Sequence, residues 1–510
     1  MADVFSPIYL GLPGLALLLF WSPVSRAEES APPAAGPSPT SIASEAGPSP
    51  SPTATPPRTA AENASFAAVF RLGWDAANER RYHDAVTEYS EAIRLKPDDP
   101  AVYNNRGAVY QILKQYQQAI ADYNRAISLK PSAAVYNNRG NAYRELKQYE
   151  NAESDYTEAI RLKPDFAEAY ANRGYIRKTL SEPASAISDY SEAITLKSEF
   201  ATAYDGRGNV YVSSGQYDNA IADYNEAIRL SPNLAVAYMD RGLAYEALKR
   251  NQDAIKEYTE AIKCRPDFAA AYLKRANVYQ QSQRYKQAIS DYAEVVRIEP
   301  SSAETYGNLG LACNALGEYD RAITSCSEAV RLKPDFADGY YNLALAYNAL
   351  SQYQKAVASC GNAIRLKPNF AEAYYNRGLA FKMLRQYGKA VASCNDAIRL
   401  KANFAEAHCV RGSAYSALKR YLKALADYNV ALGLNAQSSD VYYARGQTYL
   451  ALKQYSKAVA DFTAAIGLRP DFADAYYNRG LAYDRLKQHD KAAADYSEVI
   501  RLKQGQPQPL

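Results

Sequence analysis

The sequence contains few of the residues that build catalytic and metal centres. Its 510 residues include only 3 histidines and 6 cysteines, and His83, His408 and His489 lie far apart along the chain. A zinc site needs three or four such ligands close together. No nucleophile is paired with a base, and no phosphate-binding loop is present. We therefore expect no enzyme activity, no metal site and no cofactor.

An excess of charge of one sign is also missing. The chain has 59 lysines and arginines against 55 acids, which leaves a net charge of +4, and both signs are interspersed. Proteins that bind nucleic acids concentrate basic residues into a stripe or patch that neutralises phosphates. The sequence therefore predicts no nucleic-acid partner.

The long apolar run lies near the N-terminus, at residues 8–21 (IYLGLPGLALLLFW). Ser25 and Ala27 are small residues of the kind that a signal peptidase recognises, but no lysine or arginine precedes Arg26. An apolar segment of this size would also just span a bilayer. We interpret residues 1–27 as a signal peptide or an N-terminal anchor of an exported, periplasmic or envelope-associated protein. A cytoplasmic location is the third alternative.

Residues 28–65 are rich in proline, alanine, serine and threonine and offer almost nothing to bury. This composition is typical of flexible tethers. We predict a disordered linker at 28–65 and a disordered tail at 504–510.

The rest of the chain is a repeated unit. A small residue recurs every 34 positions from Gly73 to Gly480, with a single step of 33, and a second small residue follows each one by 12. Thirteen copies therefore occupy residues 66–503. In the copy at 100–133, apolar residues recur at three- and four-residue steps through two segments, which predicts two amphipathic helices. Pro131 marks the turn into the next copy.

Small residues at positions 8 and 20, aromatic residues at 4, 11, 17 and 24, and proline at 32 of a 34-residue unit resemble the tetratricopeptide repeat family. Positions are counted within each copy, so that Gly107 is position 8 of the second. The resemblance implies an all-α, right-handed superhelical solenoid of thirteen antiparallel helix pairs. Its inner wall would be lined by the first helices of the pairs.

Position 7 is arginine in ten copies, and nine of these ten carry an acid at position 23. The copies with Leu309 and Leu343 at position 7 have Ser325 and Ser359 at position 23. In an antiparallel pair, positions 7 and 23 lie at nearly the same height. We predict an ion pair between the two helices of each of these nine copies, with Arg377 opposite a serine as an exception.

Position 6, on the first helix, is asparagine in seven copies: Asn105, Asn138, Asn172, Asn308, Asn342, Asn376 and Asn478. A column of amides can donate to and accept from an extended peptide backbone. The column is similar to the asparagine ladder in the repeat domain of O-GlcNAc transferase, and this resemblance implies peptide binding. The alternative is that asparagine here is ordinary repeat consensus.

In the later copies, position 5 becomes tyrosine and position 2 becomes acidic. The tyrosines are Tyr341, Tyr375, Tyr443 and Tyr477, and the acids are Glu304, Asp338, Glu372, Glu406, Asp440 and Asp474. Aromatic and acidic side chains on one wall favour a basic peptide through cation–π and charge contacts. The alternative is that the acids only complement the helix dipole.

Cys326, Cys360 and Cys394 occupy position 24 of three successive copies. Equivalent positions of stacked helices lie about 8 to 10 Å apart, beyond the roughly 7 Å that a disulfide allows between Cα atoms. We expect a buried column of thiols. Cys313 is the one partner to test, opposite Cys326.

These features predict a noncatalytic scaffold that binds extended peptide segments in the concave groove of the superhelix. The alternative is a membrane-tethered structural assembly factor for the export of envelope proteins or polysaccharide. No capping helix covers the last copy, which predicts self-association or partner docking at that end.

Overall fold

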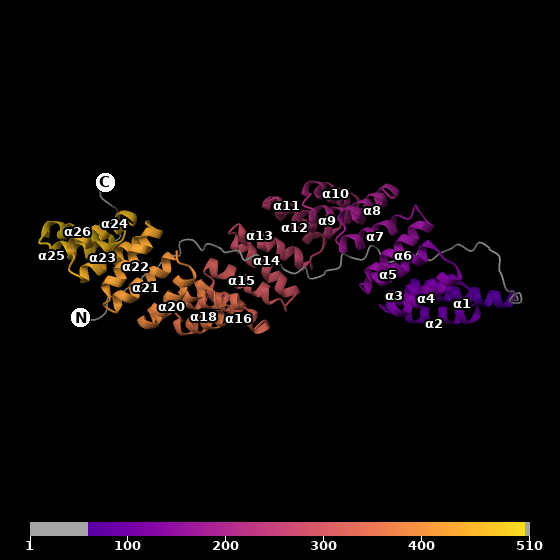
Figure 1. The fold of residues 1–510 in the computed structure, drawn as a ribbon, viewed down its shortest axis with the longest axis horizontal. Helices are drawn as coiled ribbons and strands as arrows, with labels where there is room; N and C mark the ends of the chain where they lie inside the picture. The colour runs from indigo at the N-terminus through magenta and orange to yellow at the C-terminus, as the bar shows by residue number, and fades with distance from the viewer. Residues whose placement is uncertain (1–59, 505–510) are drawn as a thin grey trace. The chain divides into compact units, whose positions relative to one another are not determined.

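The computed structural model describes residues 60–504. The regular structure in this range consists of 26 α-helices in consecutive pairs, as the repeat predicted (Figure 1). The predicted signal peptide or anchor at 1–27, the linker up to residue 59 and the tail from residue 505 lie outside the described residues. None of the helices between Ala60 and Lys503 is both long and apolar enough to cross a membrane.

The first helices of the thirteen repeats are α1 (Ala60–Asn78), α3 (Pro100–Ile112), α5 (Ala133–Glu145), α7 (Ala167–Thr179), α9 (Ala201–Ser213), α11 (Ala235–Ala247), α13 (Ala269–Gln281), α15 (Ala303–Leu316), α17 (Ala337–Ala349), α19 (Ala371–Met383), α21 (Ala405–Ala417), α23 (Ser439–Ala451) and α25 (Ala473–Arg485). The second helices are α2 (Tyr82–Leu95), α4 (Tyr116–Leu129), α6 (Tyr149–Leu162), α8 (Pro183–Leu196), α10 (Tyr217–Leu230), α12 (Asn251–Cys264), α14 (Tyr285–Ile298), α16 (Tyr319–Leu332), α18 (Tyr353–Leu366), α20 (Tyr387–Leu400), α22 (Tyr421–Leu434), α24 (Tyr455–Leu468) and α26 (His489–Lys503).

The first helix begins at Ala60, six residues before the predicted start of the first repeat at Phe66. The sequence placed the linker boundary at residue 65, whereas α1 already begins at Ala60. That boundary was wrong because it came from the repeat period alone. The segment AAENAS before Phe66 contains good helix formers and no proline, so the helix continues backwards past the first repeat.

Local sequence features mark the ends and the starts of the helices. The turn within a repeat contains a residue in the left-handed region at position 15, such as Lys114 with φ 58° or Gly215 with φ 74°. At the start of α3, the Asp99 carboxylate accepts a hydrogen bond from the Ala101 N–H at 3.0 Å. Such a cap satisfies an N–H that has no partner within the helix.

Glycine at position 8 lets the two helices of a repeat approach closely. A Cβ atom on Gly107 would lie 2.8 Å from a ring carbon of Tyr123, at position 24. The Tyr123 side chain and Ala119 are fully buried. The small residue on the first helix therefore makes room for the aromatic ring on the second, and the pair encloses its own apolar core.

The predicted thiol column is buried as expected. Cys326, Cys360 and Cys394 are each 0 % exposed and take the place of the aromatic residue at position 24. None of the six cysteines forms a disulfide, so the pairing of Cys313 with Cys326 that was singled out for testing is not made.

Contacts divide the described residues into two units, 60–271 and 272–504. The sequence predicted one continuous body for residues 66–503. A solenoid has no core that extends beyond neighbouring repeats, since each repeat packs only on the next, as α3 packs on α4 and α4 on α5. Repeats 1 to 6 lie in the first unit. Repeats 8 to 13, with most of repeat 7, lie in the second.

Candidate functional site

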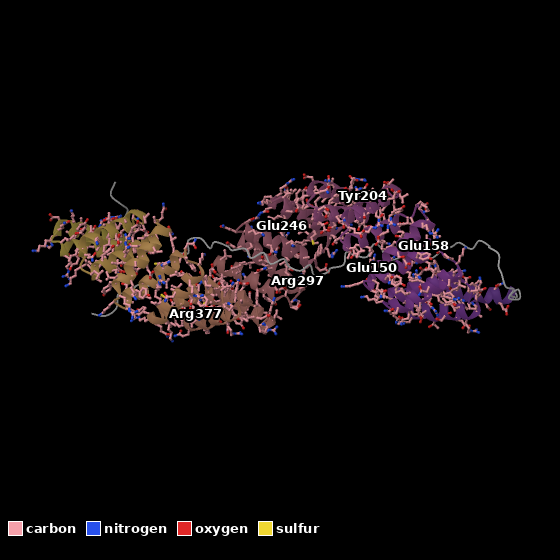
Figure 2. The ribbon with its side chains drawn as sticks, in the orientation of Figure 1. Glu150, Glu158, Tyr204, Glu246, Arg297 and Arg377 are labelled. Carbon is pink, nitrogen blue, oxygen red and sulfur yellow. The ribbon has the colours of Figure 1, made fainter. Side chains whose placement is uncertain are left out.

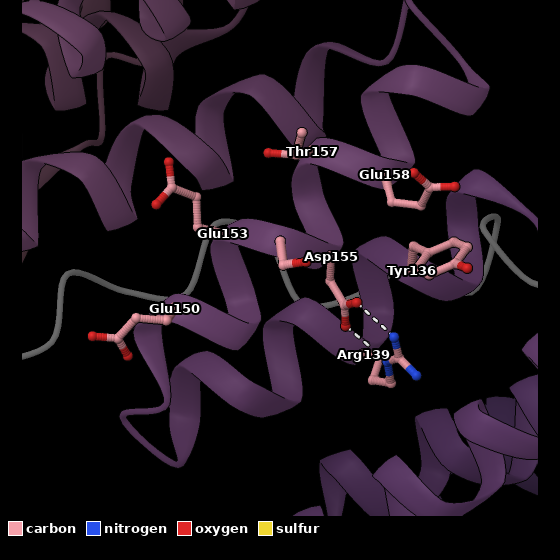
Figure 3. A pocket seen from close by; sticks show the side chains of 8 residues that line it. Tyr136, Arg139, Glu150, Glu153, Asp155, Thr157 and Glu158 are labelled. Atoms are coloured by element: carbon pink, nitrogen blue, oxygen red, sulfur yellow. Dashed lines mark hydrogen bonds and ion pairs between the residues drawn. The ribbon is translucent and has the colours of Figure 1, made fainter.

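The nine predicted ion pairs between positions 7 and 23 all form. Their shortest N–O distances lie between 2.6 and 2.8 Å. In repeat 3, Arg139 donates from Nε and Nη2 to the two carboxylate oxygens of Asp155 (Figure 3). Arg377, labelled in Figure 2, instead donates to the Ser393 hydroxyl at 3.2 Å. The pairs are Arg106–Asp122, Arg139–Asp155, Arg173–Asp189, Arg207–Asp223, Arg241–Glu257, Arg275–Asp291, Arg411–Asp427, Arg445–Asp461 and Arg479–Asp495.

The same arginines also hold the preceding repeat, which the sequence analysis missed. The Nη1 atom of Arg106 donates to the hydroxyl of Ser90 at 2.9 Å, and that of Arg445 donates to the side-chain oxygen of Asn429 at 2.6 Å. Both acceptors occupy position 25. The sequence contained a signal for this contact between repeats. Position 25 is serine, asparagine or threonine in the copy before most arginine copies, whereas it is Ala293 in the copy before Leu309.

These ion pairs are largely removed from solvent. The arginine side chains are 13 to 19 % exposed and the acids 4 to 14 %. Burial raises the pKa of Asp155, and the hydrogen bond from Arg139 opposes that shift. Buried pairs of this kind matter most when one partner is lost. We interpret these ion pairs as contacts that stabilise the packing within and between repeats.

Five of the seven asparagines at position 6 donate to position 5 of the preceding repeat, whereas Asn105 Nδ2 is buried without a hydrogen-bond partner among the described residues. Asn138 Nδ2 lies 3.1 Å from Asn104 Oδ1, and Asn172 Nδ2 lies 2.9 Å from Asn137 Oδ1. The acceptors for the later asparagines are the Gly307 carbonyl for Asn342 at 3.4 Å, the Tyr341 hydroxyl for Asn376 at 3.4 Å and the Tyr443 hydroxyl for Asn478 at 3.0 Å. The amides therefore link neighbouring first helices.

Burial separates the predicted asparagines into two groups. Asn105, Asn172, Asn342 and Asn376 are between 2 and 6 % exposed, whereas Asn138 and Asn308 are half-buried. A peptide that bound the amides of Asn172, Asn342 and Asn376 would first have to break the bonds between the first helices. Their arrangement favours the repeat-consensus interpretation for these three positions.

The predicted tyrosines at position 5 pack against aromatic rings of their own repeat. The ring centroids of Tyr341 and Phe370 lie 4.7 Å apart, and those of Tyr375 and Phe404 lie 5.0 Å apart. Tyr443 is buried against Phe472. Tyr341 and Tyr375 are half-buried, and Tyr477 is 49 % exposed. Four tyrosines that are equivalent in sequence thus differ in what they offer to a partner.

Most of the acids at position 2 are paired with a base at position 31 of the same repeat. Glu304 lies 2.6 Å from Lys333, and Asp440 lies 2.7 Å from Arg469. Asp338 and Glu372 have longer contacts with Lys367 and Lys401, at 4.0 and 3.5 Å. These contacts offset the negative charge of the wall and weaken its predicted attraction for a basic peptide. Positions 2 and 31 are both charged in these copies, so the sequence already contained a signal for this pairing.

A half-buried apolar strip lies on the first helices of repeats 8 to 10. It consists of Leu311 on α15, Tyr341 and Leu345 on α17, and Tyr375 and Leu379 on α19. Positions 5 and 9 share one face of a helix because they are four residues apart. Helix α15 contacts α17, and α17 contacts α19. We call these five residues the leucine–tyrosine strip. The leucines at position 9 were not singled out from the sequence.

Amide oxygens without partners lie beside the leucine–tyrosine strip, at position 12. Asn314 donates to the Asn342 carbonyl at 2.9 Å and Asn348 donates to the Asn376 carbonyl at 3.3 Å. Their Oδ1 atoms are buried and have no hydrogen-bond partner among the described residues. The hydrogen bonds that they donate fix the orientation of each amide.

A cavity of about 580 Å³ opens beside α5 and α6 (Figure 3). Three of its four acids are paired, since Asp155 bonds to Arg139, Glu153 to Arg177 and Glu158 to Arg161, while Glu150 is exposed. Between residues 60 and 504, no group of three or more histidine, cysteine or acidic side chains is placed to hold a metal ion.

Family models match most of the repeated range. A model described as TPR repeat matches residues 81–113, 208–249, 247–283, 310–351 and 346–384. Three models described as tetratricopeptide repeat match residues 100–132 and 133–166, residues 443–507, and residues 167–200, 269–302, 371–404 and 405–438. No curated protein matches the sequence.

Solved structures of other repeat proteins are similar to parts of the chain. The Cut9–Hcn1 hetero-tetramer of APC/C has 15% identity, with 86% of this chain and 93% of that chain covered and a TM-score of 0.40. A tetratricopeptide repeat protein from Parabacteroides merdae has 20% identity, with 49% of this chain and 99% of that chain covered and a TM-score of 0.41. MamA has 28% identity, with 34% of this chain and 94% of that chain covered and a TM-score of 0.32. At such TM-scores, these similarities carry no information about the function of this chain.

Proposed function

Because the chain belongs to the tetratricopeptide repeat family, we propose that it is a noncatalytic scaffold that holds an extended segment of a partner protein against its first helices. Repeats of this family typically mediate protein–protein interactions. The observation that carries the proposal is the leucine–tyrosine strip on α15, α17 and α19. The strip replaces the asparagine column as the main binding surface.

The leucine–tyrosine strip has the chemistry of an interface core. Leu345 and Leu379 keep part of their apolar surface in water, and Tyr341 and Tyr375 flank them on the same helices. Tyrosine is enriched where proteins bind one another. A partner that covered the strip would remove apolar area from water at about 25 cal/mol per Å². A row of such residues on three successive helices suits an extended segment.

The position-12 amides support the wall that carries the strip. Asn314 and Asn348 donate to the carbonyl groups of Asn342 and Asn376, on the next first helix. Since the acids at position 2 are largely neutralised, a preference for basic partners is not part of the proposal.

The proposal places the scaffold outside the cytoplasm. Its basis is the apolar run at residues 8–21, which is outside the described residues. We also propose that the chain associates with itself or with a partner through its last repeat. On α25 and α26, Tyr477 is 49 % exposed and Ile500 is 57 % exposed, which supports a contact surface on this repeat.

Site-specific crosslinking in the producing cells tests the binding surface. A photoreactive phenylalanine would replace Leu345 or Leu379 in the full-length chain. Matched controls carry it at Gly361 on α18 or Gly388 on α20, in the same two repeats, where a side chain meets open space. We expect a crosslinked partner from Leu345 and Leu379 only. Equal crosslinking from the controls would instead favour an assembly factor that works through its second helices.

A further inference from the structure

Two acids meet in repeats 5 and 6 at the positions where other repeats place two amides. Asp205 occupies position 5 of repeat 5, on α9, and Asp240 occupies position 6 of repeat 6, on α11. The equivalent residues in repeats 2 and 3 are Asn104 and Asn138, whose amides are hydrogen-bonded at 3.1 Å. The helices α9 and α11 contact one another directly. By this equivalence the two carboxyl groups lie at the same junction, and the charge of Asp240 acts on Asp205.

The Asp205 carboxyl group is only partly satisfied. Its Oδ2 accepts a hydrogen bond from Asn209 Nδ2 at 3.3 Å, while its Oδ1 is buried and has no partner among the described residues. Asp240 is 8 % exposed. Asn209 is itself held, because its Oδ1 accepts from the Tyr224 hydroxyl of α10 at 3.2 Å. An oxygen buried in this way needs a hydrogen that no neighbouring amide supplies.

The elements packed around the pair bring one base and several tyrosines. Lys178 on α7 lowers the electrostatic cost of a negative charge on Asp205, and its Nζ lies 5.3 Å from the centre of the Tyr175 ring. On α8, Tyr190 fills the space beside Gly206, where a Cβ atom would lie 2.5 Å from its ring.

On the other side of the pair, Tyr258 of α12 donates to Glu246 at 2.8 Å (Glu246 is labelled in Figure 2). The Glu246 carboxylate is thereby engaged with this tyrosine. The ammonium group of Lys178 thus acts on the Asp205 carboxyl group, beside the charge of Asp240.

Burial and the neighbouring Asp240 carboxyl raise the pKa of Asp205 well above its usual value, and Lys178 opposes the shift only partly. Two carboxylates in contact cannot both ionise without a large cost, so such pairs retain one proton between them. The proton belongs to the pair and not to one residue.

We propose that Asp205 and Asp240 hold one shared proton at neutral pH and that its loss loosens the junction between repeats 5 and 6. In the protonated pair, one carboxyl O–H donates to the other carboxylate, as the amide of Asn138 donates to Asn104. When the proton leaves for solvent, two buried anions remain and repel one another. The pair is thus a pH-sensitive contact within the stack.

The sign of the pH dependence follows from proton linkage. Because the folded pair binds a proton more tightly than unfolded aspartates do, its contribution to stability is fully present below the unfolded pKa of about 3.9. That contribution is lost as pH rises through the raised pKa of the folded pair. Alkaline conditions therefore open this junction and acidic conditions close it.

Hydrogen exchange of the full-length chain tests the proposal. Protection of the amides of α9 and α11 would be measured at about pH 6 and about pH 8.5, corrected for intrinsic exchange, with α3 and α5 as internal reference. We expect wild-type protection in α9 and α11 to fall at least about tenfold, the effect of one pKa unit, while the reference helices do not change.

The variants Asp240→Asn and Asp205→Asn restore an amide at one side of the junction, as in repeats 2 and 3. We expect either variant to abolish the pH dependence and to keep α9 and α11 protected at both pH values. Equal pH dependence in wild type and in the folded variants would overturn the proposal. So would a wild-type protection that depends on added Ca²⁺ and is removed by EDTA, since the pair would then bind a cation in place of the proton.

Discussion

Arg207 on α9 joins three helices by donating to both carboxylate oxygens of Asp223 on α10 and to the Ser191 hydroxyl on α8. The first two bonds close the helix pair of repeat 5, and the third ties that pair to repeat 4. Equivalent arginines make contacts both within and between repeats in seven other repeats.

Replacing Arg139 by alanine leaves Asp155 buried at 5 % exposure without its partner. We expect a loss of about 3 to 5 kcal/mol in the free energy of unfolding, measured by urea denaturation. The matched control is the double variant Arg139→Leu, Asp155→Ser, which copies the residues that repeat 8 carries at Leu309 and Ser325. It should be clearly more stable than the single variant. A single variant as stable as wild type would show that the pairs are independent surface charges.

Glycine at position 8 of repeat 2 packs against the ring of Tyr123, and we expect its replacement there to be costly, although repeat 7 accommodates Ala276 at the same position beside Tyr292. Gly107→Ala places a Cβ atom 2.8 Å from the Tyr123 ring, which should destabilise the chain by about 1 to 3 kcal/mol. Gly361→Ala on α18 meets open space and should stabilise it by up to about 1 kcal/mol, since alanine favours helix. Urea midpoints of the two variants provide the comparison. Equal midpoints would refute the packing argument.

Removing the amide of Asn172 should weaken the stack and not the binding of a partner. Asn172→Ala leaves the Asn137 oxygen without its donor at 2.9 Å, which is expected to cost about 1 to 3 kcal/mol. Asn308→Ala, at a half-buried position of the same column, serves as the control. If Asn172→Ala abolished partner capture while denaturation was unchanged, the asparagine column would be the binding surface after all.

The thiols of Cys326, Cys360 and Cys394 should resist alkylation in the folded chain. Burial raises the pKa of each to about 12, so almost no thiolate exists near pH 8, and it appears only as pH rises towards 12. Mass spectrometry after iodoacetamide treatment at about pH 8 should find these three unmodified and the partly exposed Cys264 modified. In urea, all should react alike. Rapid native modification of Cys360 would contradict the buried column.

The repeat period was sufficient to predict the helix pairs and the ion pairs, because both depend on spacing within one unit. Arg106 and Asp122 are 16 residues apart in a hairpin of known geometry, so their contact follows from the pattern. The exchange of Leu309 and Ser325 for the charged pair in the same positions strengthened that prediction.

The role of the asparagines could not be predicted in the same way. An amide at position 6 can face a ligand or the preceding repeat, and the choice depends on how closely successive first helices approach. Asn138 and Asn172 find acceptors on the helix before them, a contact that is set by stacking and not by the period. The early start of α1 at Ala60 likewise depends on local helix propensity outside the repeat.

The most direct test of the scaffold is the affinity of a captured partner for two charge variants of the full-length chain. One variant carries Leu345→Asp and Leu379→Asp in the leucine–tyrosine strip, and the other carries Gly361→Asp and Gly388→Asp on the second helices of the same repeats. The account predicts that the first variant raises the Kd at least about tenfold, about 1.4 kcal/mol, while the second leaves it unchanged and both remain folded by circular dichroism. An unchanged Kd for the strip variant would contradict it.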